Sequence, residues 1–180
     1  DKAPPVWVNA SAVGIYGDRG SRILTEASSG GEGFLPDSCA AWESACLNTD
    51  LPRVRRAALR IGIVLGKGGG AFEQLAKVTK MMAGGALGDG SQYMSWIHLD
   101  DLVRMILWIV ETEGVCGPIN GTAPNPVTNS QMMAAFREAF ARPFVPPAPA
   151  FFLRKVMPLM NLEPSLLLEG QRVVPEIALA

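Results

Sequence analysis

The chain has 180 residues, of which 48% are hydrophobic and 18% are charged, a composition that can bury a core and excludes an intrinsically disordered chain. Its net charge of −1 at pH 7 excludes the basic excess that nucleic-acid binding usually needs. No apolar run approaches the length of a membrane span, so we expect a protein that binds neither nucleic acid nor membrane.

The first predicted elements are a strand and a helix. Residues 6–13 form a short apolar run with β-branched members, which indicates a buried strand that ends in a glycine-containing turn at 14–18. A stretch rich in serine and glycine follows as far as Gly33. Residues 37–47 are then predicted to be helical, with a capping residue at the start and alanine and glutamate in the interior.

The middle of the chain repeats this alternation. Residues 55–65 are almost continuously apolar and predict one buried strand, which stops at the glycine-rich turn 66–70. A helix is predicted over 71–82 and a short extended piece over 94–98. A second amphipathic helix is expected over 100–113, because its apolar residues recur with a 3.6-residue period.

The last part of the chain changes character. A short strand is predicted over 115–122, and Thr128 to Gln131 has the spacing of a capping box for a helix that runs to Ala141. Four prolines then lead into two short helical pieces, at 150–157 and 165–171. Strands that alternate with helices predict an α/β fold with a parallel sheet, here followed by a mainly helical lobe.

Two turns are chemical candidates. The first turn carries Ser11 and Tyr16, and ligands of open parallel sheets bind beyond the carboxyl ends of the strands. The alternative is a tight turn whose tyrosine only packs. The turn at 66–70 resembles a phosphate cradle, but it lacks the Lys-Ser/Thr ending of a P-loop. It could clamp part of a ligand, or it could be a flexible connection.

The sequence predicts no metal site. His98 is the only histidine, and its neighbour Asp101 is expected to be the N-cap of the following helix. The three cysteines, Cys39, Cys46 and Cys116, have no metal-ligand spacing, and we expect reduced thiols of a cytoplasmic protein.

Six motifs together resemble one family. They are SAVGIYG at 11–17, FLPDSCAAWE at 34–43, ALRIGIVLGKGGGA at 58–71, SWIHLDDL at 95–102, GPINGTAPNPVTN at 117–129 and LLLEGQRVVP at 166–175. In order and spacing they are similar to epimerase-family proteins of the extended short-chain dehydrogenase/reductase superfamily. The match is to the atypical branch of NADP-dependent oxidoreductases and nucleoside-diphosphate-sugar epimerase-like proteins.

The resemblance implies a Rossmann-like sheet that binds NADP or NAD, with a smaller, mainly helical C-terminal lobe that closes over the substrate. Residues 1–122 would be the second half of the nucleotide-binding domain, with an excursion into the substrate lobe near 84–97. Residues 123–180 would be most of that lobe. The glycine-rich pyrophosphate turn would precede Asp1, and a final strand and helix would follow Ala180. Members of the superfamily commonly form homodimers through the helices that flank the sheet, which leaves a homodimer or a monomer open here. The expected location is the cytoplasm, with an organelle matrix or stroma as the alternative.

The resemblance also supplies candidate catalytic residues. Family members use a serine at the end of the first strand seen here and a Tyr-x-x-x-Lys pair on the next helix. The serine position falls on Ala12, one residue after Ser11, and the Tyr and Lys positions fall on Cys39 and Glu43. The candidates that could replace the pair are Tyr16, Cys39 with a lowered pKa, and Glu43 as a desolvated base, beside Ser11.

By the same resemblance, the expected cofactor wall consists of Ser11, Ala12, Cys39, Ile61, Gly62 and Val64. The expected substrate side consists of Met94, Ser95 and Trp96, although Trp96 could equally belong to the core. Two functions follow. One is an NADP-dependent oxidoreductase or epimerase that acts on a small or nucleotide-linked carbonyl or sugar. The other is a non-catalytic NADP-binding sensor or assembly protein that has lost the Tyr/Lys pair.

Overall fold

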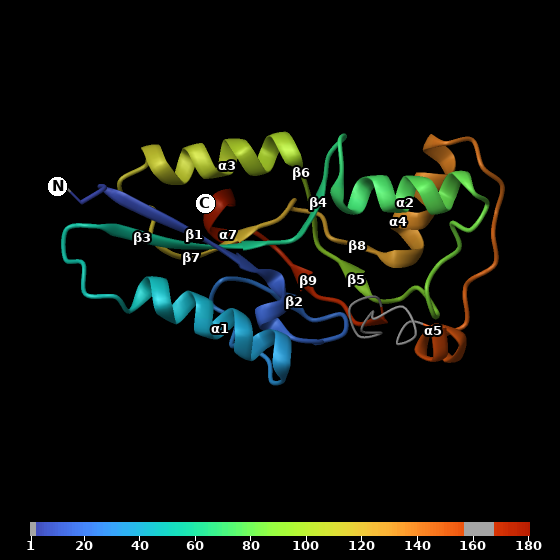
Figure 1. Ribbon diagram of the computed structural model, residues 1–180, viewed down its shortest axis with the longest axis horizontal. Helices are drawn as coiled ribbons and strands as arrows, with labels where there is room; N and C mark the ends of the chain where they lie inside the picture. The colour runs from blue at the N-terminus through green and yellow to red at the C-terminus, as the bar shows by residue number, and fades with distance from the viewer. Residues whose placement is uncertain (1–2, 157–167) are drawn as a thin grey trace.

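The computed structural model describes residues 3–156 and 168–180. Three parallel strands, β1 (Val6–Ala12), β3 (Arg55–Ile61) and β7 (Gly117–Gly121), form the central sheet in the order β1-β3-β7. Helix α3 (Leu99–Glu111) covers one face of this sheet and α1 (Phe34–Leu47) covers the other (Figure 1). The predicted α/β class with a parallel sheet is therefore confirmed.

The predicted continuous strand over 55–65 is wrong, because Gly62 divides it. β3 ends at Ile61, and β4 (Ile63–Leu65) leaves the central sheet to pair in parallel with β6 (Trp96–His98). A Cβ at Gly62 would lie 2.4 Å from the Ser95 carbonyl oxygen, so only glycine permits this close crossing. The predicted extended piece over 94–98 is likewise divided, at Ser95, into β5 (Tyr93–Met94) and β6.

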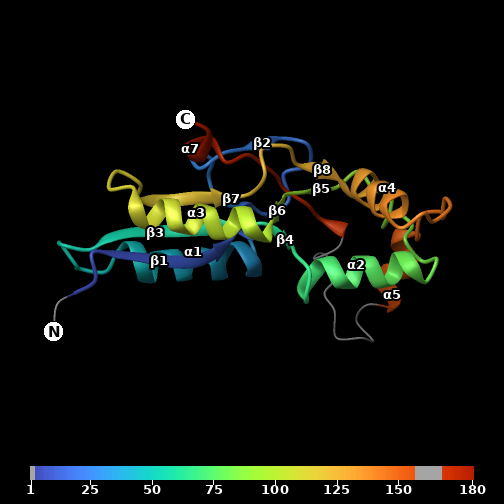
Figure 2. The same cartoon turned by 90° about the horizontal axis from the view of Figure 1, so that it is seen from above.

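A second lobe forms around two helices, as Figure 2 shows from above. Helix α2 (Gly70–Lys80) packs against α4 (Asn129–Ala139) around Phe136, and α5 (Ala150–Val156) lies nearby. β5 pairs in an antiparallel manner with β8 (Val127–Thr128). The predicted capping box is confirmed, since the Thr128 and Gln131 side chains each bond the other's backbone at the start of α4.

The C-terminal segment returns to the first lobe. β9 (Arg172–Val173) pairs in parallel with β2 (Ile23–Leu24), and α7 (Glu176–Leu179) lies against β7. The lobes are therefore not continuous in sequence, since α2 lies in the second lobe and residues 172–179 lie in the first. Of the short helix predicted over 165–171, residues 165–167 fall outside the described residues, Leu168 is helical and residues 169–171 are not. The prediction is wrong for 169–171, where the chain passes close to the Tyr93 backbone at Gly170.

The start of α3 differs from the expectation. Its N-cap is His98, whose Nδ1 accepts a hydrogen bond from the Asp100 amide at 3.2 Å, and Asp101 instead pairs with Arg104 one turn later. The predicted Asp101 cap is wrong because the N-cap lies three residues earlier, at His98, and the helix begins at Leu99. In the part of the chain that the structure describes, no helix is long and apolar enough to cross a membrane.

Candidate active site

A row of polar side chains crosses the central sheet near the carboxyl ends of its strands. Ser11 of β1 is in register with Arg60 of β3, and Arg60 is in register with Asn120 of β7. Because side chains alternate between the faces of a sheet, these three lie on the same face, the one covered by α1. All three are buried, in a sheet whose opposite face carries an apolar core.

Glu43 joins this row from α1. The Arg60 guanidinium donates to both carboxylate oxygens of Glu43, from Nε to Oε1 and from Nη2 to Oε2, each at 2.8 Å. Ser11 Oγ donates to Oε1, also at 2.8 Å. The two charged side chains are 6% and 8% exposed, and a buried ion pair needs this kind of two-point geometry to offset desolvation.

Tyr16 closes the other end of the row. The short 3-10 helix η1 (Val13–Tyr16) follows β1 directly and places the Tyr16 phenol beside Arg60. The Tyr16 hydroxyl accepts a hydrogen bond from Arg60 Nη1 at 2.8 Å and donates to Asn120 Oδ1 at 2.7 Å. Its ring centroid lies 5.1 Å from the guanidinium carbon of Arg60. Tyr16 is fully buried, so its proton is committed within the protein.

The electrostatics agree with this geometry. Burial raises the pKa of Tyr16, and the nearby Arg60 charge only partly opposes that shift, so the phenol stays protonated at neutral pH. Burial alone would lower the pKa of Arg60, but its hydrogen bonds to Glu43 and Tyr16 outweigh burial and raise it above the usual value. Arg60 is therefore a permanent cation at the centre of the row.

The structure thus brings together three of the four predicted catalytic residues, Ser11, Tyr16 and Glu43. The fourth, Cys39, lies one helical turn before Glu43 on α1 and packs beside Ala12 in an apolar cluster. The hypothesis of an activated thiol is not supported, since burial raises the pKa of Cys39. The thiol lies in the second turn of α1 rather than at its first amide groups.

The expected cofactor wall is only partly contiguous. Ala12 and Ile61 are neighbours in the register at the carboxyl ends of β1 and β3, and both are half-buried. Gly62 follows directly and is also half-buried. Val64 lies beyond the strand break, on β4, and packs against the core under α3. The first three residues share the sheet edge with Ser11, and Val64 lies apart from them.

The expected substrate residues lie at the junction of the two lobes. The Ser95 hydroxyl donates to the Gln171 carbonyl at 2.6 Å and accepts from the Val173 amide at 2.9 Å, so it fastens the returning C-terminal segment. Trp96 and Met94 both pack against the core of the second lobe. The hydrogen-bonding capacity of Ser95 is therefore used by the chain itself.

Neither glycine-rich turn provides a phosphate site next to the polar row. Residues 66–70 lead into α2, in the second lobe. The spacing G-x-x-G-x-x-G occurs at Gly14, Gly17 and Gly20, but it runs through η1 into a turn and then β2. The usual pyrophosphate turn leads from a strand straight into an α-helix. Among the described residues, no cluster of histidine, cysteine and acidic side chains could hold a metal ion.

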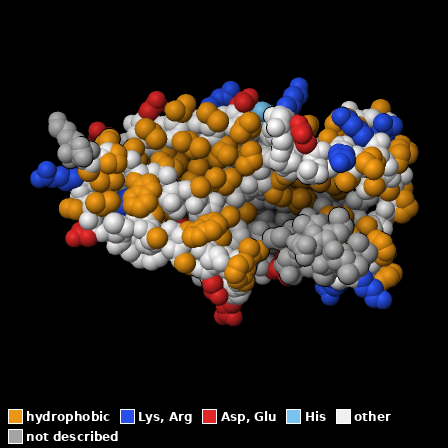
Figure 3. All heavy atoms as spheres, in the orientation of Figure 1, with side chains coloured by type: hydrophobic (Ala, Val, Ile, Leu, Met, Phe, Trp, Pro, Cys, Tyr) orange, Lys and Arg blue, Asp and Glu red, His pale blue; other side chains and the backbone are white. Residues whose placement is uncertain are grey.

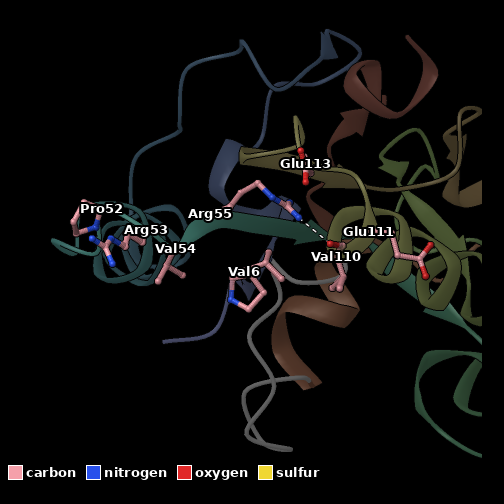
Figure 4. A pocket seen from close by; sticks show the side chains of 9 residues that line it. Val6, Pro52, Arg53, Val54, Arg55, Val110, Glu111 and Glu113 are labelled. Carbon is pink, nitrogen blue, oxygen red and sulfur yellow. Dashed lines mark hydrogen bonds between the residues drawn. The ribbon is translucent and has the colours of Figure 1, made fainter. Parts of the chain in front are cut away.

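A separate hollow lies at the opposite end of the sheet (Figure 4). Its lining includes Val6, Pro52, Arg55 and Val110, at the amino ends of β1 and β3 and the last turn of α3. Ligands of open parallel sheets bind at the carboxyl ends of the strands. The candidate active site is therefore the polar row, although the row itself is closely packed.

Sequence reasoning missed Arg60 as a central site residue, and it missed Asn120 altogether. Arg60 is a charged residue inside an apolar stretch that predicts a buried strand. Because a buried charge needs a partner, this position was a signal for a buried ion pair. Asn120 gave a weaker signal, since a single asparagine beside glycines is also typical of a turn.

A parallel sheet covered by helices on both faces, with a polar row at its carboxyl edge, defines a Rossmann-like α/β protein. The Arabidopsis thaliana protein named "Epimerase family protein SDR39U1 homolog, chloroplastic" is 41% identical over 172 residues, which are 96% of this chain and 48% of that protein. Bacillus subtilis epimerase family protein YfhF is 38% identical over 98% of this chain and 57% of its own length. No model of a known protein family matches the chain.

Solved structures agree. Human epimerase family protein SDR39U1, crystallised with NADPH, superposes with a TM-score of 0.89 at 32% identity, over 98% of this chain and 59% of the human chain. A nucleoside-diphosphate sugar epimerase from Corynebacterium glutamicum gives a TM-score of 0.76 at 33% identity, over 96% of this chain and 33% of its own. The chain belongs to this epimerase family. It spans about half of the length of the Arabidopsis relative.

Proposed function

We propose that the protein is an NADP-dependent oxidoreductase or nucleotide-sugar epimerase-like enzyme. The nicotinamide end of the cofactor would lie at the carboxyl ends of β1 and β3. The observation that carries the proposal is the polar row, which places a serine hydroxyl backed by a buried ion pair at this sheet edge. The human relative was crystallised with NADPH, and a further relative of known structure is named a nucleoside-diphosphate sugar epimerase.

The residues at this edge fit the nicotinamide end of NADP. Ala12 is small, and with its register neighbour Ile61 it offers a half-buried apolar surface for a flat ring. When bound, the cofactor supplies the hydride acceptor or donor. Ser11 is the residue of this chain that would orient a polar group next to that ring. The pyrophosphate needs a glycine-rich strand-to-helix turn, and no strand of the central sheet has one among the described residues.

A direct test is binding followed by turnover. We expect the full-length protein to bind NADPH, with nicotinamide fluorescence as the readout, and to exchange hydride with a member of a panel of carbonyls, alcohols and nucleotide sugars. Ala12→Phe should weaken NADPH binding at least about tenfold by filling the ring surface, whereas Ala134→Phe, at an exposed position of α4, should not. Residues 1–180 alone should bind NADPH poorly. Micromolar affinity of that piece would contradict the placement of the pyrophosphate outside it.

A second function has one observation in its favour. The phenol of Tyr16 is fully buried with its proton committed, and burial raises the pKa of the Cys39 thiol, so neither group is prepared for acid–base work. This favours a non-catalytic NADP-binding sensor or assembly protein. Tight NADPH binding without any hydride transfer across the panel would support the sensor and reject the enzyme.

A further inference from the structure

The direction of the hydrogen bonds along the polar row is fixed by its one permanent cation. Arg60 can only donate, and it donates to both oxygens of Glu43. Both Glu43 oxygens are therefore acceptors in this row. Ser11 Oγ lies 2.8 Å from Glu43 Oε1, so the single hydroxyl proton of Ser11 must point at Glu43.

This leaves Ser11 with lone pairs and no proton to offer. A hydroxyl oxygen that has donated its proton can still accept two hydrogen bonds. Among the described residues none donates to Ser11 Oγ. Ser11 is the penultimate residue of β1, and this buried side chain lies one residue before the half-buried Ala12 at the carboxyl edge of the sheet. A ligand group that meets this oxygen must therefore bring its own hydrogen.

We propose that Ser11 is a dedicated hydrogen-bond acceptor for a neutral N–H or O–H group of the ligand, and that Glu43 and Arg60 are the positioning residues that enforce this polarity. The inference rests on the proposed function. Two kinds of ligand group have such a donor at this edge: the carboxamide N–H of the nicotinamide and a hydroxyl of a sugar substrate. A ligand with a carbonyl or a fluorine at that point would present a lone pair to a lone pair and would bind more weakly.

The contacts of Arg60 on its other side support this polarity. Arg60 also donates to the Tyr16 hydroxyl, whose own proton has the Asn120 Oδ1 atom at 2.7 Å as its nearer acceptor and the Thr25 carbonyl at 3.1 Å as its farther one. The Asn120 amide in turn donates to the Val174 carbonyl at 3.0 Å, in the returning C-terminal segment. Arg60 is therefore a donor to both Glu43 and Tyr16, and either orientation of the Tyr16 proton leaves its two bonds to Glu43 in place.

The test compares ligands that differ in one donor. Dissociation constants are measured for NADP⁺ and for its 3-acetylpyridine analogue, in which a methyl ketone replaces the carboxamide and no N–H remains. The full-length wild type should prefer NADP⁺ by about tenfold, a typical effect of one hydrogen bond. Ser11→Ala should abolish this preference, and Ser11→Thr, which retains the hydroxyl, should keep it.

A second pair of probes separates the substrate from the cofactor. UDP-glucose is compared with UDP-4-deoxy-4-fluoroglucose, whose fluorine cannot donate. A preference for the hydroxyl that Ser11→Ala removes would assign the acceptor to the substrate, and the same result with the pyridine pair would assign it to the cofactor. If Ser11→Ala changes neither ratio, the inference is wrong while the proposed function stands. If the wild type binds none of these nucleotides, both the inference and the proposed function are rejected.

The positioning role has its own readout. The double variant Glu43→Leu with Arg60→Met replaces the buried pair by apolar side chains of similar size, an exchange that proteins often tolerate. Ser11 is then still present but free to rotate, so it can donate or accept. The preference of the wild type for the donor ligand should fall to about onefold. Retention of the full preference in a folded double variant would show that Glu43 and Arg60 do not set the polarity.

Discussion

Strand β3 carries arginines at both of its ends, and Arg55 and Arg60 differ in the groups to which they donate. At the amino end, Arg55 donates to the carbonyls of Ile109, Val110 and Val115, beside the hollow shown in Figure 4. At the carboxyl end, Arg60 donates to a carboxylate and a phenol in a closely packed row. The hollow of Figure 4 is at one end of the sheet and the buried polar row is at the other.

This difference shows why a hollow alone does not identify a site. The partners of Arg55 are mainly backbone carbonyls at the end of α3, where a cation satisfies free acceptors and the negative end of the helix dipole. Arg55 therefore completes a helix. Arg60 instead fixes side chains whose hydrogens can point in more than one direction. The carboxyl end therefore holds a hydroxyl whose hydrogen-bond direction is set by its neighbours.

The molecular surface gives a similar lesson. Figure 3 shows apolar side chains gathered in front of the central sheet, the side on which β1 is the edge strand. Leu99, Val103 and Leu107 of α3 and Trp42 of α1 are among the large apolar residues exposed in the chain. Extent of apolar surface and chemical function are therefore separate properties of this molecule.

The largest effect should come from Arg60→Met. It leaves the Glu43 carboxylate buried without a counter-ion, and we expect a loss of about 3–5 kcal/mol in the free energy of unfolding. Urea denaturation measures it. Glu43→Leu added to Arg60→Met should restore most of that loss. A single variant within 1 kcal/mol of the wild type would contradict the central role of the ion pair.

Gly62→Ala should come next, with a loss of about 2–3 kcal/mol, because the new methyl group would meet the backbone oxygen of Ser95. The matched control is Gly114→Ala, where a Cβ has open space around it, and its effect should stay within about 0.5 kcal/mol. Thermal unfolding of both variants provides the comparison. Equal effects would mean that the strand crossing at the carboxyl end is not tightly packed.

Tyr16→Phe should cost about 1–2 kcal/mol at pH 7, since Arg60 Nη1 and Asn120 Oδ1 lose their shared partner. The difference should shrink above pH 10. The folded pKa of Tyr16 is raised, so the unfolded wild type ionises first, near its ordinary value of about 10, and the wild type loses stability as the pH rises towards the folded pKa. The variant lacks that loss. Urea titrations between pH 7 and 11 test this, and a gap that widens with pH would reverse the assigned sign.

Arg55→Met should have the smallest effect, about 1 kcal/mol, because the bonds that it removes are part-buried or exposed, so that water can replace the guanidinium. Hydrogen exchange of the last turn of α3 is the more sensitive measurement. We expect faster exchange there and no change in NADPH affinity of the full-length protein. A loss of affinity as large as that of Ala12→Phe would place function at the amino end and remove the contrast between the two ends.

Local patterns were sufficient for much of the fold. The parallel α/β class, the strand over β1, the amphipathic α3 and the Thr128–Gln131 capping box follow from periodicity and capping chemistry, which act within a few residues. The division of residues 55–65 at Gly62 could not be predicted, because the apolar pattern continues across it. That break is imposed by Ser95, which is far away in sequence.

The site divides in the same way. The sequence by itself identified Ser11, Tyr16, Cys39 and Glu43 as candidate catalytic residues, and six motifs in order indicated the family. Only the tertiary structure decided that Ser11, Glu43, Arg60, Tyr16 and Asn120 form one row, because strand register and the seat of α1 set those contacts. It also gave the row its polarity. Which way a hydroxyl proton points depends on the charges that surround it in space, and no spacing along the chain records that.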